Sequence, residues 1–207
     1  MTRSPVIDAA EVTSPLRLLD VRDAASFEAG HAPGAVRVPI EDWIAAARST
    51  EGNFANTDFW ADAFKALGVG TGSGAGVYDD GRMTEAARVW FILQYFGLPA
   101  VILNGGWPAV EAASLSGADP DPRAPDLTPG SGRVGLMDRA RLKTALETET
   151  VFDARTEAEH HGHDLKSNAR GGHLPGAVLL PHADLLDGPR LRAPDELRRH
   201  SYPRRVM

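Results

Sequence analysis

Cysteine is absent from the 207-residue sequence. That absence excludes disulfides, thiolate metal ligands and any mechanism in which a thiol of this chain is the nucleophile. No run approaches the roughly eighteen continuous apolar residues of a membrane-spanning helix, and residues 1–16 lack the apolar core of a signal peptide. The formal net charge of −6 gives no general reason to expect nucleic acid or an anionic membrane as a partner. We therefore expect a cytoplasmic protein without such partners.

Two further absences concern cofactors. The glycine-rich run 68–76 follows a predicted helix and leads into a predicted strand, the reverse of a nucleotide-binding loop, and contains no Gly-Lys-Ser/Thr. The histidines at 160, 161, 163 and 173 have no cysteine beside them and no convincing helical i, i+4 pair. We interpret the first segment as a helix-to-strand connection and the histidines at 160–163 as part of a solvated loop. The sequence thus predicts no cofactor and no metal.

An internal repeat is the most informative feature that is present. Segments 18–43 and 151–186 each contain Asp-x-Arg after a short apolar strand, then Gly-His-x-Pro-Gly-Ala, then a β-rich stretch with a proline. The Asp-to-His spacing is 11 residues in the first copy and 20 in the second, which indicates a nine-residue insertion. The matched positions are Asp20, Arg22, His31 and Gly34 in the first copy and Asp153, Arg155, His173 and Gly176 in the second. We expect these residues to be structural, with each histidine holding its x-Pro-Gly turn by hydrogen bonds.

The repeat divides the chain into domains. Residues 114–132 are rich in Pro, Gly, Ser and Asp, a composition typical of an interdomain linker. The sequence therefore predicts a first domain at 5–113, a linker at 114–132 and a second unit at 133–207.

Strands and helices alternate along the first domain. Strands are predicted at 17–20, 36–38, 75–78 and 100–103. Helices are predicted at 24–29, 59–67 and 85–96, with a last short helix after the "NGGW" of residues 104–107. This alternation predicts an α/β fold with a mostly parallel sheet covered on both faces by helices.

The segment "VYDDGRMTEAARVW", residues 77–90, contains the candidate functional site. Asp79 and Asp80 follow a strand directly, where open α/β sheets usually place their chemistry. One hypothesis is a Mg²⁺-dependent phosphatase or phosphoacceptor with a carboxylate nucleophile, although the required set of further acidic ligands and a partner lysine or threonine is missing. The alternative is that the carboxylates accept hydrogen bonds from the N–H groups of the loop and the following helix.

In combination, these blocks resemble the rhodanese family, specifically the tandem two-domain sulfurtransferases of the thiosulfate and 3-mercaptopyruvate type. The resemblance spans nearly the whole chain and depends on "LLDVR" with "GHAPGAVRVP", "VYDDGRMTEAARVWFILQYFG", "VILNGGW", and "VFDAR" with "GGHLPGAVLLP". It implies two rhodanese-like parallel sheets flanked by helices. It also implies transfer of sulfane sulfur from a small anionic donor, thiosulfate or 3-mercaptopyruvate, to a thiophilic acceptor.

The resemblance further implies where the catalytic group would lie. In the family, the strand-to-helix turn of the catalytic domain holds a cysteine within a cradle of backbone N–H groups, and the first of two tandem domains is often non-catalytic with aspartate at that place. Asp79 occupies the cysteine position of the first domain in this sequence. Arg170 resembles an arginine that binds anionic substrate in the family; a solvated loop arginine is an equal alternative.

The second copy departs from the family pattern. His31 precedes Asp79 by 48 residues, and the same interval from His173 leads to about residue 221, beyond Met207. We therefore expect a truncated or frame-shifted sulfurtransferase that comprises one complete domain and the first half of a second, without a catalytic residue and inactive as written. The alternative is a non-catalytic rhodanese-like binding or regulatory module. We also expect residues 133–207 to be poorly stable, to self-associate or to dock onto the first domain.

Overall fold

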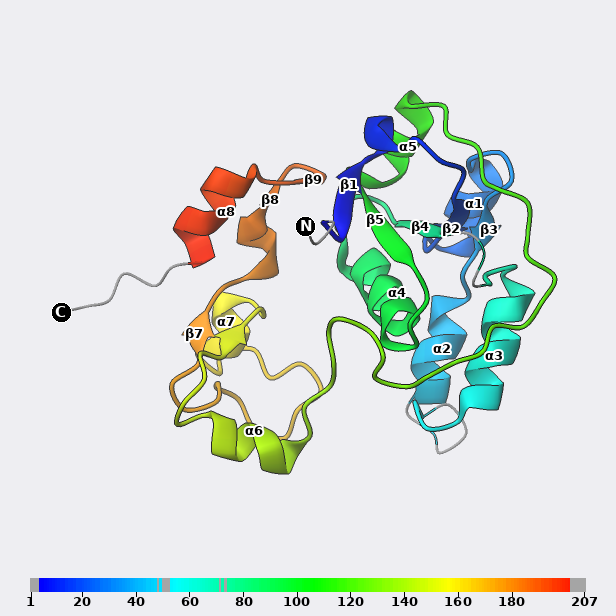
Figure 1. The fold of residues 1–207 in the computed structure, drawn as a ribbon. Helices are drawn as coiled ribbons and strands as arrows, with labels where there is room; N and C mark the ends of the chain where they lie inside the picture. The colour runs from blue at the N-terminus through cyan, green and yellow to red at the C-terminus, as the bar shows by residue number, and fades with distance from the viewer. Residues whose placement is uncertain (1–3, 48, 50–52, 71, 73, 202–207) are drawn as a thin grey trace. The chain divides into compact units, whose positions relative to one another are not determined.

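The computed structural model describes residues 4–47, 49, 53–70, 72 and 74–201. The chain divides into two compact units, Met1–Gly135 and Leu136–Met207 (Figure 1). None of the described helices is long and apolar enough to cross a membrane.

The first unit is built on a five-stranded sheet in the order β1-β5-β4-β2-β3, and every neighbouring pair of strands is parallel (Figure 1). The strands are β1 Val6–Asp8, β2 Arg17–Asp20, β3 Val36–Arg37, β4 Ala75–Tyr78 and β5 Ala100–Asn104. The helices are η1 Ala9–Glu11, α1 Ala24–Ala29, α2 Ile40–Ala47, α3 Thr57–Ala66, α4 Thr84–Tyr95 and α5 Gly106–Ala112. The predicted α/β fold with a parallel sheet flanked by helices is confirmed.

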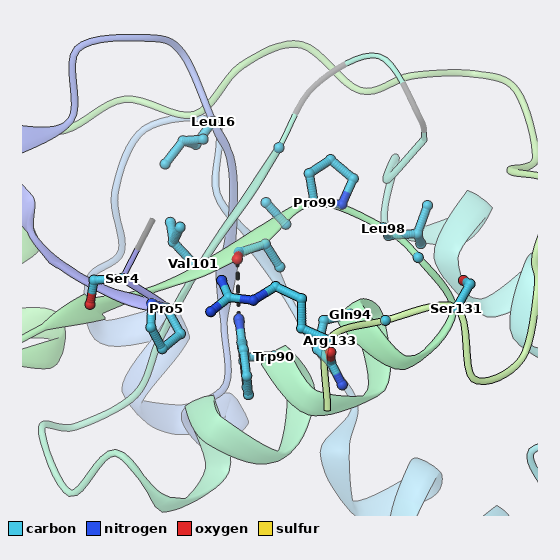
Figure 2. A pocket seen from close by; sticks show the side chains of 15 residues that line it. Ser4, Pro5, Leu16, Trp90, Gln94, Leu98, Pro99, Val101, Ser131 and Arg133 are labelled. Atoms are coloured by element: carbon cyan, nitrogen blue, oxygen red, sulfur yellow. Dashed lines mark hydrogen bonds between the residues drawn. The ribbon is translucent and has the colours of Figure 1, made fainter. Parts of the chain in front are cut away.

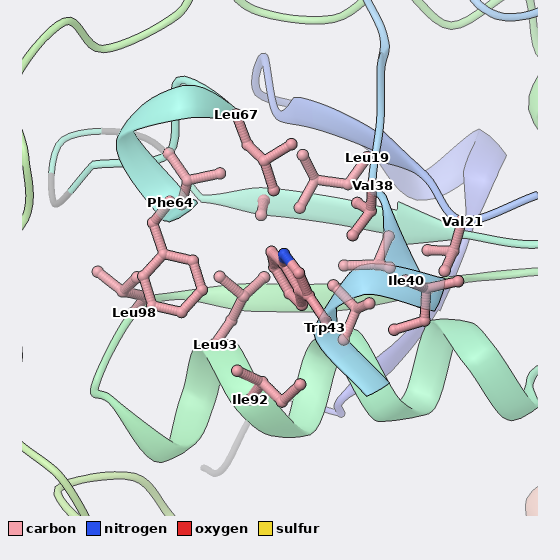
Figure 3. Packing of buried hydrophobic residues seen from close by; sticks show 14 of the residues in the cluster. Leu19, Val21, Val38, Ile40, Trp43, Phe64, Leu67, Ile92, Leu93 and Leu98 are labelled. Atoms are coloured by element: carbon pink, nitrogen blue, oxygen red, sulfur yellow. The ribbon is translucent and has the colours of Figure 1, made fainter. Parts of the chain in front are cut away.

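Alternation along the strands gives the sheet two apolar faces. Leu19 of β2 and Val77 of β4 pack in one cluster with side chains of α2, α3 and α4, including Trp60. Figure 3 shows Leu19 with Trp43 and Leu93 of this cluster. The residues next to them, Leu18 and Tyr78, pack in a second cluster with Val110 of α5. The central strands are buried on both sides because each face has its own layer of helices.

Two elements of the first unit differ from the sequence-based expectation. The strand β1 has only three residues, too short a pattern to distinguish from a loop, and it pairs at the sheet edge with β5. The helix α2 begins directly after Pro39, at the end of the predicted β-rich stretch 36–39, and no element was predicted for its residues. Its Trp43 is buried against Trp60. A helix as short as α2 owes most of its stability to tertiary packing of this kind.

The segment predicted as an interdomain linker lies along the first unit. The Gly117 N–H donates to the Pro33 carbonyl at 2.8 Å, and the Ala118 N–H donates to the Leu16 carbonyl at 2.7 Å. Further along, the Gln94 side chain both donates to and accepts from the Val134 backbone, at 2.7 and 3.0 Å. The division between the two compact units correspondingly falls after Gly135.

The second unit contains two small sheets. Strands β6 Phe152–Asp153 and β7 Val178–Leu179 pair in parallel, and β8 Leu186–Asp187 pairs antiparallel with β9 Arg190–Leu191. The helices are α6 Arg139–Ala145, α7 Glu157–His160, η2 His182–Leu185 and α8 Pro194–Ser201. The register of β6 on β7 repeats that of β2 on β3: Phe152 faces Val178 as Leu19 faces Val36. The sequence repeat is therefore also a repeat of local structure.

Candidate functional site

The candidate site lies in the loop between β4 and α4, at the carboxyl end of the central strand. Asp79 is the first residue after β4 and is only 4% exposed. A buried carboxylate requires compensating hydrogen bonds. Their donors are backbone N–H groups of the loop and of the first turn of α4.

Three N–H groups converge on the Asp79 carboxylate. Oδ1 accepts from Gly81 at 2.9 Å and from Met83 at 3.1 Å, and Oδ2 accepts from Ala86 at 3.2 Å. Two of these N–H groups belong to residues with positive φ, 102° at Gly81 and 65° at Met83. This backbone forms a concave anion site of the kind found at helix N-termini, and the carboxylate of the chain itself fills it.

The loop is fixed from behind by α5. The Trp107 N–H donates to the Asp79 carbonyl at 2.8 Å. Gly106 has φ of 58°, and a Cβ there would lie 2.4 Å from the Gly81 nitrogen and 2.6 Å from the Asp79 oxygen. Only glycine permits this approach, because the conformation and the space both exclude a side chain. The "NGGW" motif thus supports the loop after β4.

The second charged group of the site is the Asp20–Arg22 pair at the end of β2. Asp20 is fully buried, and its Oδ2 lies 2.6 Å from Arg22 Nη2, which also donates to the Gly30 carbonyl at 2.7 Å. The Arg22 guanidinium lies 4.5 Å from the centroid of the Trp107 ring, within cation–π range. The Arg22 side chain is therefore held in place by the Asp20 carboxylate, the Gly30 carbonyl and the face of the Trp107 ring.

A cavity of about 270 Å³ opens beside these groups. Its lining mixes both signs of charge: Val21, Arg22, Asp23, Ser26, Asp79, Asp80, Arg82, Thr84 and Glu85. Asp80 pairs with Arg82 at 2.6 Å, and this hydrogen-bonded cation lowers the pKa of the Asp80 carboxyl. Tyr78, the buried last residue of β4, precedes Asp79; burial and the neighbouring Asp20 charge raise the pKa of Tyr78 well above its usual range, so its phenol stays neutral. The cavity has ionised side chains but no sulfur nucleophile.

Among the described residues, no group of three or more His, Asp or Glu side chains is arranged to hold a metal ion. The hydrogen bonds to Asp79 instead match the alternative in which the carboxylate accepts N–H groups of the loop and helix.

The second copy places its motif residues in the same local arrangement. Asp153 pairs with Arg155 at 2.7 Å, and Arg155 donates to the Gly172 carbonyl at 2.9 Å. Gly34 and Gly176 have φ values of 73° and 77°, so both x-Pro-Gly turns need glycine. Arg170 is exposed in the loop before the second turn.

One expectation in this region is wrong. His160, predicted to belong to a solvated loop, ends helix α7 and is 6% exposed, with Nδ1 3.0 Å from Asp153 Oδ2. The helix begins with a capping box formed by Thr156 and Glu159, and the Thr-x-x-Glu pattern was the sequence signal for it.

A second cavity, of about 380 Å³, lies at the opposite ends of the strands, where β4 and β5 begin (Figure 2). Leu16, Leu98, Pro99 and Trp90 give it apolar walls, and the Trp90 indole N–H donates to the Ala100 carbonyl at 3.1 Å. Sequence reasoning did not indicate this cavity, because its walls come from segments that are far apart in the sequence. It contains none of the predicted site residues.

Residues 6–113 match the family model of the rhodanese-like domain, slightly more than half of the chain. The chain therefore belongs to the rhodanese family. This agrees with the parallel sheet and with the N–H cradle after the central strand.

The particular relatives are sulfurtransferases. The 3-mercaptopyruvate sulfurtransferase of Escherichia coli (strain K12) is 28% identical over 187 residues, covering 84% of this chain and 64% of that protein. The putative thiosulfate sulfurtransferase SseB of Mycobacterium tuberculosis (strain ATCC 25618 / H37Rv) is 28% identical over 204 residues, covering 90% and 71%. The chain thus spans less than two thirds of the length of the Escherichia coli relative.

Solved structures agree on the fold. The crystal structure of SseA from Escherichia coli, a 3-mercaptopyruvate sulfotransferase, has a TM-score of 0.70 with 25% identity, covering 91% of this chain and 78% of that one. The 3-mercaptopyruvate sulfurtransferase from Leishmania major has a TM-score of 0.66 at 22% identity, covering 94% and 60%.

Proposed function

We propose that residues 5–113 are the non-catalytic rhodanese module of a sulfurtransferase that moves sulfane sulfur from thiosulfate or 3-mercaptopyruvate to a thiophilic acceptor. The observation that carries this proposal is the occupied cradle. Asp79 stands where the family resemblance expects a cysteine, and its carboxylate takes three N–H groups at 2.9–3.2 Å. The relatives named as sulfurtransferases support the wider activity.

A carboxylate cannot replace the thiolate in this chemistry. Sulfane sulfur is carried as a persulfide, which requires a sulfur nucleophile. A negative charge in the cradle would also repel an anionic donor. Because the 207 residues contain no cysteine, the chain alone should produce no thiocyanate from thiosulfate and cyanide; turnover by the purified chain would contradict the proposal.

A sharper test introduces a thiol into the cradle. In Asp79→Cys, the three N–H groups and the N-terminus of α4 should stabilise the thiolate, as helix N-termini do. The matched control is Asp80→Cys, at the residue after Asp79. The native Asp80 carboxylate lies outside the cradle and pairs with exposed Arg82. We expect half-maximal alkylation by iodoacetamide at a pH at least about one unit lower for Asp79→Cys. Equal midpoints would mean that the cradle is not an anion site.

A second candidate function is a binding or regulatory module. The cavity of about 270 Å³ beside Arg22 and Arg82 favours it, because this cavity offers charged side chains without a nucleophile. Saturable binding of one protein to the purified chain, lost in Arg82→Glu but kept in Lys65→Glu, would support this function. Binding that both variants keep would contradict a role for this cavity.

For the second unit, we propose that Arg170 contacts the anionic donor and that strand β6 mediates self-association. Among the described residues, β6 pairs with β7 alone, and Phe152 is 41% exposed although its counterpart Leu19 is fully buried. Sedimentation of the chain over a range of concentrations should show a dimer that Phe152→Lys weakens. A monomer at all concentrations would exclude the association. The cytoplasmic location and the domain limits 114–132 and 133–207 stay predictions.

A further inference from the structure

The two ends of loop 161–172 in the second unit lie close together, between α7 and the second x-Pro-Gly turn. We call this point of closest approach, at Gly162 and Gly171, the neck of the loop. The backbones of Gly162 and Gly171 approach so closely that a Cβ on Gly171 would lie 2.7 Å from the Gly162 Cα. Arg155 donates to the Gly172 carbonyl at 2.9 Å. His173 Nδ1 lies 2.9 Å from the His160 carbonyl oxygen and joins the two ends of the loop.

The side chains at the neck are two stacked imidazoles. The rings of His160 and His173 have centroids 3.7 Å apart and are inclined by 6°. In the first copy the same stack is made by Phe27 and His31, at 3.8 Å and 7°, and His31 Nδ1 lies 2.8 Å from the Phe27 carbonyl oxygen. The geometry is the same in both copies, but one ring has changed from a phenyl group to a titratable imidazole.

The hydrogen bonds determine where each imidazole of the second copy can take a further proton. Carbonyl and carboxylate oxygens only accept, so Nδ1 of His173 donates to the His160 carbonyl. Nδ1 of His160 faces Asp153 Oδ2 at 3.0 Å. The hydrogen bonds of Arg155 hold the pKa of the Asp153 carboxyl well below its usual range. Asp153 therefore stays a hydrogen-bond acceptor at neutral and mildly acidic pH. In each ring, Nε2 is therefore the nitrogen left to bind a further proton.

One carboxylate, Asp153, lies against His160 at 3.0 Å, and it is the only acidic group in contact with either ring of the pair among the described residues, so it can compensate one cation but not two. On the β6 side, Asp153 is already shared with Arg155. On α7, Glu157 Oε1 lies 4.0 Å from Nε2 of the neighbouring His161, and Glu159 is held by Thr156 in the capping box. In the loop, the His163 ring lies 6.1 Å from that of His161, and Asp164 pairs with Lys166 at 2.8 Å.

We propose that the stacked pair His160–His173 is a proton-operated latch that holds the neck of loop 161–172 and releases it when both rings are cations. Imidazoles change charge between about pH 5 and 8. One added proton leaves a cation on a neutral ring, whereas a second places two positive charges face to face at 3.7 Å. Release would free the loop that contains Arg170. The latch stands on these contacts and does not depend on the proposed sulfur chemistry.

The direct test is a titration of the histidine ring signals by NMR in the full chain. Because the two sites interact, we expect two macroscopic steps separated by at least about one pH unit. In His160→Phe, which copies the first unit, the His173 signal should titrate in a single step. The matched control His161→Phe removes an imidazole that is not stacked on His173, and it should keep both steps.

The loop itself is followed by hydrogen exchange over residues 161–176, corrected for the intrinsic effect of pH. We expect about tenfold faster corrected exchange at pH 5.5 than at pH 7.5 in the original chain, and no such change in His160→Phe. The reverse variant Phe27→His should make exchange around residues 27–35 sensitive to pH. Independent, coincident titration of His160 and His173, or loosening that persists in His160→Phe, would overturn the latch.

Discussion

The two copies of the repeat form one local structure in two different surroundings. The Asp–Arg pair closes at 2.6 Å in the first copy and at 2.7 Å in the second, and each arginine also donates to a glycine carbonyl. The side chain of Arg22 is 8% exposed, however, while that of Arg155 is 40% exposed. The motif therefore encodes its own hydrogen bonds, whereas burial comes from the elements packed around it.

The sheets explain this difference. Strand β2 lies between β3 and β4, and its Leu19 is covered by α2, α3 and α4. Strand β6 pairs with β7 alone among the described residues. A parallel strand needs neighbours on both edges and helices on both faces to become fully buried. The same interactions should then differ in their contribution to stability between the two units.

The largest expected effect comes from breaking the buried ion pair. Asp20→Ala leaves the Arg22 charge buried without its carboxylate, and it should reduce the free energy of unfolding of the first unit by about 3–5 kcal/mol. All four tryptophans, 43, 60, 90 and 107, lie in this unit, so denaturation followed by tryptophan emission measures it selectively. Asp153→Ala should leave that transition unchanged and loosen only the second unit, as seen by hydrogen exchange. Equal losses of stability from Asp20→Ala in the first unit and Asp153→Ala in the second would refute the claim that burial makes the first ion pair contribute more.

A slightly smaller loss of stability is expected from substitutions at the equivalent apolar residues of β2 and β6, Leu19 and Phe152. Leu19→Ala opens a cavity in a closed core and should cost about 3 kcal/mol. Phe152→Ala removes a larger side chain that is 41% exposed, so its effect on the exchange of β6 and β7 amides should be much smaller. Tryptophan emission and amide exchange measure the respective changes. At concentrations where the chain is monomeric, a strong destabilisation by Phe152→Ala would mean that this side chain is covered within the chain itself.

Much of this architecture could be predicted from the sequence because it depends on local signals. Strands 17–20 and 75–78, the helix 24–29 and both x-Pro-Gly turns follow from apolar runs, capping residues and glycines, and the structure has them. The position of Asp79 at the end of β4 follows from the strand-to-helix pattern. The three N–H donors to its carboxylate could not be assigned, because Met83 adopts a positive φ that its residue type does not signal.

Long-range features could not be predicted for a different reason. Gly106 supports the Asp79 loop from another element, and the stack of His160 on His173 spans the insertion that obscured the alignment with Phe27. Composition predicted an interdomain linker at 114–132, but it gave no signal for the backbone hydrogen bonds that attach this segment to the first unit. In each case the contact that determines the structure joins residues far apart in the chain, and the sequence around each residue does not indicate its partner.

The two units should also respond differently to mild acid. In the first unit, the hydrogen-bonded partners Arg37 and Arg82 lower the pKa values of Glu41 and Asp80. A carboxyl whose pKa is lower in the folded state stabilises it above the unfolded pKa, and this contribution disappears as the pH falls through the folded pKa. The denaturation midpoint by tryptophan emission should therefore stay constant from pH 7 to about 5 and fall below about pH 4.

The second unit, in contrast, should loosen within the interval of about pH 8 to 5 in which imidazoles change charge. Hydrogen exchange measured on the same samples reports this change. A fall in the tryptophan-detected midpoint over that higher interval would show that the first unit has an acid-sensitive element of its own, and the contrast between the copies would then fail.

The smallest expected effect concerns the helix caps of the two copies. Thr156 begins α7 with a capping box, in which its hydroxyl accepts from the Glu159 N–H at 3.3 Å and Glu159 accepts from the Thr156 N–H at 3.2 Å. Thr156→Ala should cost about 1 kcal/mol. Because His160 is the last residue of this four-residue helix, the loss should also raise amide exchange at the neck of loop 161–172.

Thr156→Ser retains the hydroxyl and should restore slow exchange, which separates the cap from the methyl group. In the first copy, Asp23 caps α1 by accepting from the Ser26 N–H at 2.9 Å, but Phe27 stacks there on His31 without a second titratable ring. Asp23→Ala should therefore loosen α1 equally at pH 7.5 and 5.5, whereas Thr156→Ala should loosen α7 more at the lower pH. The same pH response in both variants would show that cap and imidazole pair act independently.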